Sequence, residues 1–202
     1  MAASLFRLAF FVALVLPQTS ALSSNYYSKS CPKLFQVVNP IMDKAIRRRL
    51  ELGCDGSLLL DDTPTFTGEK TTPRNVNIRG FDVIDDIKTA VEMECPGIVS
   101  CADILAIASQ VSVRKLRGPI WHLMLGRLDA RTANKDLADA NLPSFSLNLG
   151  GLKTNFQNVG LSEKDLVALS GGHTIGQAVC TTFRTRIYTD TNIDPIFAAK
   201  RQ

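Results

Sequence analysis

The amino-acid sequence predicts a mainly α-helical domain. Apolar residues recur at spacings of three and four in several segments, which is the period of helices that pack against a core on one side. Strand-like patterns are scarce, and the only candidates are 57–60 and 121–125, both short. Of the 202 residues, 45% are hydrophobic and 21% are charged, as in an ordinary globular protein. This length predicts roughly one domain.

The first 21 residues predict a secretory signal peptide that is not part of the fold. Arg7 carries a positive charge, an unbroken apolar run follows at 8–16, and Pro17 ends it before the small residues at 19–21. The run is shorter than the about 20 apolar residues that a membrane-spanning helix needs. We therefore expect residues 22–202 to form one exported domain with no membrane attachment after cleavage.

Three helices are predicted in the first half of that domain. An apolar stripe covers 34–45 and contains Pro40, which is expected to kink the helix. A second stripe covers 81–91. The third helix begins at Ser100, which forms a variant of a capping box with Asp103.

Three further helices are predicted towards the C-terminal end. One covers about 149–158, and the next begins at Ser162, which is followed three residues later by Asp165. The last is expected to follow a pair of glycines and to begin near His173.

Charge and motif content exclude several classes of function. The net charge of +4 is small and evenly spread, which does not fit a nucleic-acid-binding protein. Two histidines are too few for a multi-histidine zinc site. The chain has neither the G-x-S-x-G elbow of serine hydrolases nor a glycine-rich phosphate-binding loop.

His173 is the most informative single residue. It lies in the segment 169–176 (LSGGHTIG), where small residues on both sides allow a large flat group to approach the backbone. A neutral imidazole is a good ligand for iron, so an axial haem ligand is a physically sensible role. The alternative is a histidine at a helix start that is satisfied by a hydrogen bond.

A polar turn at 53–57 offers oxygen donors for a hard cation. Asp55 and Ser57 alternate along it, Gly53 has a carbonyl to offer, and Glu69 follows Ser57 by twelve residues. Calcium takes six to eight oxygen ligands, and such a set supplies several of them. The alternative is an Asx-type turn without a metal.

The order of several motifs resembles that of the class III secretory plant peroxidases, which are haem enzymes. Each motif is weak alone, but their succession behind a signal peptide is highly specific. The matching segments are 25–32 (NYYSKSCP), 53–62 (GCDGSLLLDD), 79–85 (RGFDVID), 99–103 (VSCAD), 125–129 (LGRLD), 141–143 (NLP) and 165–176 (DLVALSGGHTIG).

The resemblance implies a haem-peroxidase-like helical domain with heme b and calcium as cofactors. Its reaction would be the reduction of hydrogen peroxide with one-electron oxidation of phenolic small molecules, by a monomer in the cell wall or apoplast. The residue roles that it implies are the proximal haem ligand at His173, a proximal calcium ligand at Thr174, the distal calcium site at Gly53, Asp55, Ser57 and Glu69, the aromatic-donor entrance at Pro143, and a disulfide between Cys31 and Cys95.

The chain departs from the family pattern in two ways that make the domain incomplete. The family has an Arg-x-x-Phe-His-Asp-Cys helix just before Gly53, whereas this chain has 45–52 (AIRRRLEL), so about twenty family residues are expected to be missing. The distal histidine and arginine, two calcium ligands and the partner of Cys54 go with them. The family also continues past Gln202, with the aspartate that hydrogen-bonds the axial histidine and the partners of Cys101 and Cys180.

No distal catalytic residue is therefore expected in this chain, and its peroxidase turnover is expected to be impaired. Five cysteines cannot all pair within one chain, and the family pattern leaves only the pair of Cys31 and Cys95. The alternative function is that of a non-catalytic haem- or calcium-binding remnant or a wall-associated structural protein.

Overall fold

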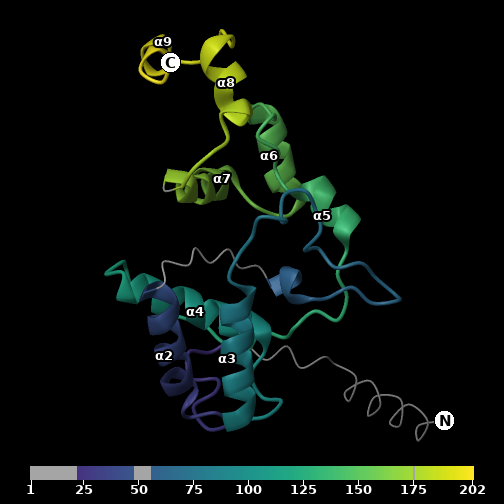
Figure 1. Ribbon diagram of the computed structural model, residues 1–202, viewed down its shortest axis with the longest axis vertical. Coiled ribbons are helices and arrows are strands. Elements are labelled where there is room, and N and C mark those ends of the chain that lie inside the picture. Colours follow the sequence, from purple (N-terminus) through teal and green to yellow (C-terminus); the bar gives the residue numbers. More distant parts are fainter. Residues whose placement is uncertain (1–21, 48–55, 175) are drawn as a thin grey trace, which may run out of the picture. The chain divides into compact units, whose positions relative to one another are not determined.

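A computed structural model describes residues 22–47, 56–174 and 176–202, and the regular elements of this part are all helical (Figure 1). The mainly α-helical class predicted from the sequence is confirmed. The α-helices are α2 (Leu34–Arg47), α3 (Phe81–Glu94), α4 (Cys101–Lys115), α5 (Lys135–Asn141), α6 (Leu149–Asn158), α7 (Glu163–Ser170), α8 (Cys180–Tyr188) and α9 (Pro195–Ala199), and the 3₁₀ helices are η1 (Gly56–Leu59) and η2 (Gly171–Thr174).

The chain divides into two compact units. Unit 1 takes the described residues that fall within Met1–Lys70 and Asn77–Ala133, and unit 2 takes those within Thr71–Val76 and Asn134–Gln202. The predicted signal peptide lies outside the described residues.

Unit 1 is built on α2, α3 and α4, which pack on one another (Figure 1). Each helix turns one apolar face inward, as the spacing of its apolar residues predicts. Pro40 lies inside α2, as expected. The buried residues of the three helices are Leu34, Val38, Met42 and Ala45 in α2, Val83, Ile84, Ile87 and Val91 in α3, and Asp103, Ile104, Ile107, Ala108 and Val111 in α4.

Two expected strands are absent from the described residues. Most of 57–60 belongs to the 3₁₀ helix η1, and within 121–125 only Leu125 forms an isolated antiparallel bridge, to Ser23. The bridge consists of backbone hydrogen bonds of 2.8 and 3.0 Å between Ser23 and Leu125. A strand needs a neighbour along its length for its backbone hydrogen bonds, and these short segments have none.

The predicted sixth helix begins later than expected. His173 lies in η2, and α8 starts only at Cys180. Gly176 has a φ of 147°, which favours glycine and interrupts the helical path between the two elements. The short helices α5 and α9 were not predicted, although capping side chains at Asn134 and Asp194 mark their starts.

Asp103 is the polar centre of unit 1 and is fully buried. Its Oδ2 accepts hydrogen bonds from the Tyr27 hydroxyl at 2.8 Å and the Gly126 backbone N–H at 2.6 Å, and its Oδ1 accepts one from Arg127 Nη1 at 3.0 Å. Gly126 has a φ of 115°, and a Cβ there would lie 2.9 Å from the ring of Tyr26. Only glycine fits this close approach.

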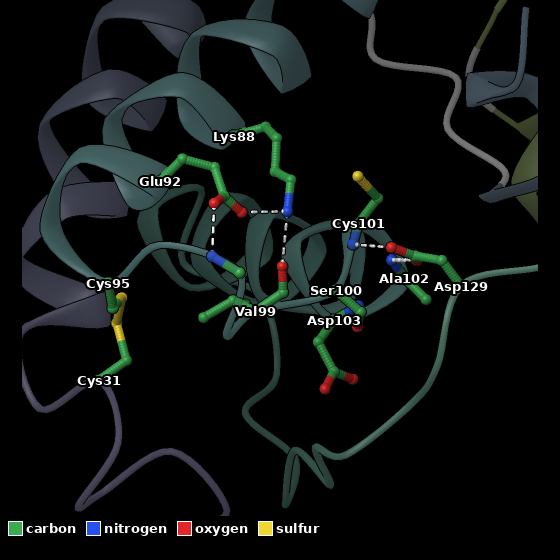
Figure 2. A network of polar contacts seen from close by, with 11 residues as sticks. Cys31, Lys88, Glu92, Cys95, Val99, Ser100, Cys101, Ala102, Asp103 and Asp129 are labelled. Atoms are coloured by element: carbon green, nitrogen blue, oxygen red, sulfur yellow. Dashed lines mark hydrogen bonds and ion pairs between the residues drawn. A yellow bond between two sulfur atoms is a disulfide. The ribbon is translucent and has the colours of Figure 1, made fainter.

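The start of α4 is capped by side chains from two segments (Figure 2). The Ser100 hydroxyl accepts from the Asp103 N–H at 3.1 Å, as the predicted cap requires. The Asp103 carboxylate does not complete a capping box, because it turns into the core. Asp129 takes that place and accepts from the N–H groups of Cys101 at 2.9 Å and Ala102 at 2.8 Å. A carboxylate at this end is also favoured by the helix dipole.

Unit 1 is expected to lose stability between about pH 10 and 12. Burial of the phenol, and then its hydrogen bond to Asp103, raise the pKa of Tyr27 to about 12. Because the folded pKa lies above the unfolded one, this contribution is complete below about pH 10 and is lost as the pH rises through 12.

The measurement is the urea midpoint at pH 9 and at pH 11.5 for the wild type and Tyr27→Phe. The wild type should lose more stability than the variant between the two pH values. Equal losses in both proteins would contradict the assignment.

Candidate functional site

Unit 2 contains an open pocket of about 1040 Å³. Cofactor pockets are typically apolar clefts of this order with a few polar groups. Most of the lining is apolar and comes from α6, α7 and the loop between α5 and α6, and its polar members are Arg74, Asn75, Asp139, Ser144, Ser170 and His173. The apolar lining includes Leu142, Pro143, Phe145, Leu147, Leu152, Phe156, Leu166 and Leu169.

Helix α7 leads the chain to this pocket and begins at the capping box predicted from the sequence. The Ser162 N–H donates to Asp165 Oδ2 at 2.8 Å, and the Asp165 N–H donates to Ser162 Oγ at 3.3 Å. The Ser162 hydrogen bonds lower the pKa of the Asp165 carboxyl. Leu166 is buried one turn later. The helix ends at Ser170, and η2 follows directly at Gly171–Thr174.

His173 lies in η2, is exposed, and lines the pocket. Within the part of the chain that the structure describes, its imidazole makes no hydrogen bond. The hydrogen bond that the helix-start alternative requires is not present among the described residues, and the role of His173 stays a prediction. Its ring nitrogens are available for a ligand, and an imidazole nitrogen beside an apolar pocket suits the iron of a flat macrocycle.

The structure places Pro143 in the lining of the same pocket. The two residues that the resemblance assigns to haem and to the aromatic-donor entrance are thus brought together across 30 positions of sequence. Thr174 is exposed in η2, and its hydroxyl donates to the Gly171 carbonyl at 2.7 Å.

The predicted calcium ligands are only partly described. Gly53 and Asp55 lie outside the described residues, Ser57 belongs to η1, and Glu69 is half-buried. Within the described ranges, no group of three or more His, Cys, Asp or Glu residues could hold a metal ion. The calcium sites therefore stay predictions.

Cys31 and Cys95 form a disulfide with their Cα atoms 5.6 Å apart (Figure 2). This is the pair that the resemblance implies. Both residues are buried, and the bond connects the chain just before α2 to the end of α3. Cys101 and Cys180 carry free thiols, and Cys54 lies outside the described residues.

Sequence reasoning missed three polar residues of the lining, which we call the polar edge of the pocket. Arg74, Asn75 and Asp139 lie there, and Arg74 Nη1 donates to the Asp139 backbone carbonyl at 2.9 Å. Pro73 and Asn75 mark a turn in the sequence, but no local pattern shows that this turn meets α5.

In the part of the chain that the structure describes, no helix is both long enough and apolar enough to cross a membrane.

The chain matches one family model and several known proteins, and all of them are named peroxidases. The family model described as peroxidase matches residues 1–202. Peroxidase RIP1 of Medicago truncatula is 51% identical, over 93% of this chain and 64% of the relative. Peroxidase 4 of Vitis vinifera is 50% identical, over 91% and 62%, and Peroxidase P7 of Brassica rapa subsp. rapa is 49% identical, over 90% and 67%. The chain spans about two thirds or less of the length of these relatives.

The alignments also contain positions that have no counterpart in this chain. The alignment with the Medicago relative has 207 positions, but 93% of 202 residues is about 188, so about 19 positions have no counterpart in this chain. The same comparison with the Vitis relative, with 200 positions and 91% of the chain, gives about 16. These numbers agree in size with the gap of about twenty residues predicted before Gly53. With a family match along its whole length and relatives of this identity, the chain belongs to the peroxidase family, in its class III plant branch.

Proposed function

We propose that this chain is a secreted haem peroxidase that binds heme b in the unit 2 pocket, with His173 as the axial ligand. The observation that carries the proposal is an exposed imidazole without a hydrogen-bond partner among the described residues, at an apolar pocket of about 1040 Å³. The pocket has the size and the apolar walls that a flat macrocycle requires. The family membership of the chain supports the choice of haem over other ligands.

When bound, haem supplies the redox chemistry that reduces hydrogen peroxide and oxidises phenolic donors one electron at a time. The residues of this chain hold and shield that group. His173 would supply the coordinating nitrogen, and the leucine and phenylalanine side chains that line the pocket would contact the flat apolar faces of the group. Pro143 lines the same pocket and is proposed to border the path of an aromatic donor.

We propose that turnover by this chain alone is low. Peroxide cleavage benefits from a base that moves a proton between the two oxygens and from a cation that stabilises the developing charge, and each contributes about 10²–10⁴-fold. By the motif comparison, the distal histidine and arginine that do this in the family have no counterpart here.

We further propose that the chain binds calcium, is located outside the cell and is a monomer. Carboxylate, hydroxyl and carbonyl oxygens are the ligands that calcium prefers, which supports a distal site at Gly53, Asp55, Ser57 and Glu69 and a proximal one at Thr174. The predicted signal peptide and the disulfide support an extracellular location, in the cell wall or apoplast. The chain is proposed to act as a monomer.

Replacing His173 by alanine is expected to weaken haemin binding by about 100-fold or more, because the only iron ligand from the protein is lost. The measurement is a haemin titration of the purified chain followed by its Soret band. His122→Ala is the matched control, since His122 is the other histidine of the chain and does not line the pocket. Equal affinity of His173→Ala and the wild type would refute the proposed axial ligand.

The same preparations separate the catalytic proposal from the non-catalytic alternative. We expect a Soret band together with guaiacol oxidation far below that of a complete family member. Vigorous guaiacol oxidation would contradict the low turnover. The absence of a band in the wild type would favour a structural or calcium-binding protein.

A further inference from the structure

We propose that Arg74 recognises a carboxylate on a planar, apolar ligand in the unit 2 pocket. The inference rests on the proposed function in one respect, namely that this pocket is a ligand site. Beyond that function, the inference identifies the chemical group of the ligand that binds at the polar edge, a carboxylate, and the residue that binds it, Arg74.

Arg74 is held at the edge of the pocket from two sides. The turn that carries it is closed by hydrogen bonds from the N–H groups of Asn75 and Val76 to the Thr72 carbonyl, at 2.9 and 3.2 Å. Its guanidinium is fixed by the 2.9 Å hydrogen bond from Nη1 to the Asp139 carbonyl in α5. A guanidinium held in this way loses less conformational freedom when it binds a ligand than a free surface arginine does.

The charge of Arg74 is not neutralised within the part of the chain that the structure describes. No carboxylate there forms an ion pair with it, and its side chain is exposed. An arginine has five N–H donors in a planar fork, and the bond to Asp139 uses one of them. A carboxylate fits the remaining donors, because its two oxygens match the spacing of the fork.

The rest of the lining defines the body of the ligand. The same lining contains Leu142, Phe145, Leu152 and Phe156, which favour a flat, apolar group over a sugar or a peptide. The ligand is therefore amphipathic, with an aromatic or macrocyclic body and a carboxylate at its edge. Two molecules of the proposed function share this chemistry, namely haem through its propionates and a phenolic acid donor through its side chain.

The other charged residue of the lining is Asp139, which acts in the opposite sense. Its Oδ1 is buried and has no hydrogen-bond partner in the described part, so it is not accessible to a ligand. Its backbone carbonyl accepts from the Arg74 guanidinium at 2.9 Å, so its negative charge belongs to the residue next to that guanidinium and is expected to lower the attraction for an anion. Asp139→Asn removes this charge without changing the shape of the side chain, and it should tighten binding of a carboxylate ligand.

The test compares acids with their esters on the full chain. Haemin is paired with haemin dimethyl ester, and 4-hydroxycinnamate with its methyl ester, by Soret titration and by calorimetry. We expect Arg74→Gln to weaken binding of at least one acid by about tenfold and to leave its ester unchanged. Arg74→Lys should recover part of the loss, and Asp139→Asn should tighten binding of the same acid by about twofold to threefold. Arg131→Gln, an exposed arginine outside the pocket, is the matched control.

Each result has a defined meaning. A loss confined to haemin assigns Arg74 to a propionate, and a loss confined to the cinnamate assigns it to the donor. If the variant binds both acids as tightly as the wild type does, the inference is wrong, while a Soret band that depends on His173 keeps the proposed function intact. If haemin does not bind but the cinnamate binds through Arg74, the inference stands and the proposed function fails.

Discussion

Removing the disulfide with Cys31→Ala and Cys95→Ala together is expected to lower the free energy of unfolding by about 4 kcal/mol. The bond closes a loop with a sequence separation of 64 residues, and a cross-link of that span removes about this much conformational entropy from the unfolded chain. It also holds the start of α2 against the end of α3, two of the three helices that form the core of unit 1.

The measurement is urea unfolding followed by the fluorescence of Trp121. This is the only tryptophan of the chain and belongs to unit 1, so it reports on the unit that contains the disulfide. Cys180→Ala is the matched control, because Cys180 is exposed and carries a free thiol. A double variant whose midpoint stays within error of the wild type would refute the expected loss.

Asp103→Asn is expected to destabilise unit 1 by about 3 kcal/mol. The carboxylate is fully buried and accepts hydrogen bonds from Tyr27, Gly126 and Arg127. An asparagine of the same shape offers one acceptor oxygen and an NH₂ group, which would face N–H and O–H donors. It also leaves the Arg127 guanidinium without its ion-pair partner, and breaking one side of a buried pair typically costs about 3–5 kcal/mol. Arg127 is 39% exposed, so water offsets part of this cost.

The control is Asp86→Asn, since Asp86 is an exposed residue of α3. It should change the free energy of unfolding by less than about 0.5 kcal/mol, as surface substitutions do. If the two variants unfold at the same urea concentration, the buried hydrogen bonds of Asp103 do not stabilise unit 1.

The sequence predicted the helices of unit 1 well because their apolar spacing and their burial have one cause. Ile84, Ile87 and Val91 recur at helical period, and all three are buried. Helix α5 has seven residues and none is buried, so no apolar stripe marks it. The buried role of the Asp103 carboxylate could not be predicted from the sequence either. Its position suggests a helix cap, while its hydrogen-bond partners lie 23 to 76 positions away.

The residues of the candidate site also fall into those that local sequence predicts and those that it does not. His173 was recognised because the glycines and small residues beside it form a local pattern, and the structure places it in one pocket with Pro143. Arg74 and Asp139 escaped recognition because a hydrogen bond across 65 positions brings them together. Local sequence patterns carry no information about contacts of this kind.

The long loop closed by Cys31 and Cys95 makes unit 1 tolerant of changes in length. Its sequence separation of 64 spans the join at Leu52-Gly53, where agreement with the family motifs starts abruptly. Closure entropy grows only with the logarithm of loop length, so adding or deleting about twenty residues there alters it by about 0.2 kcal/mol. We therefore expect peroxidases with a shorter or a longer segment at this join to keep the same three-helix core. Evolution or splicing can then change the length of that segment without loss of the core.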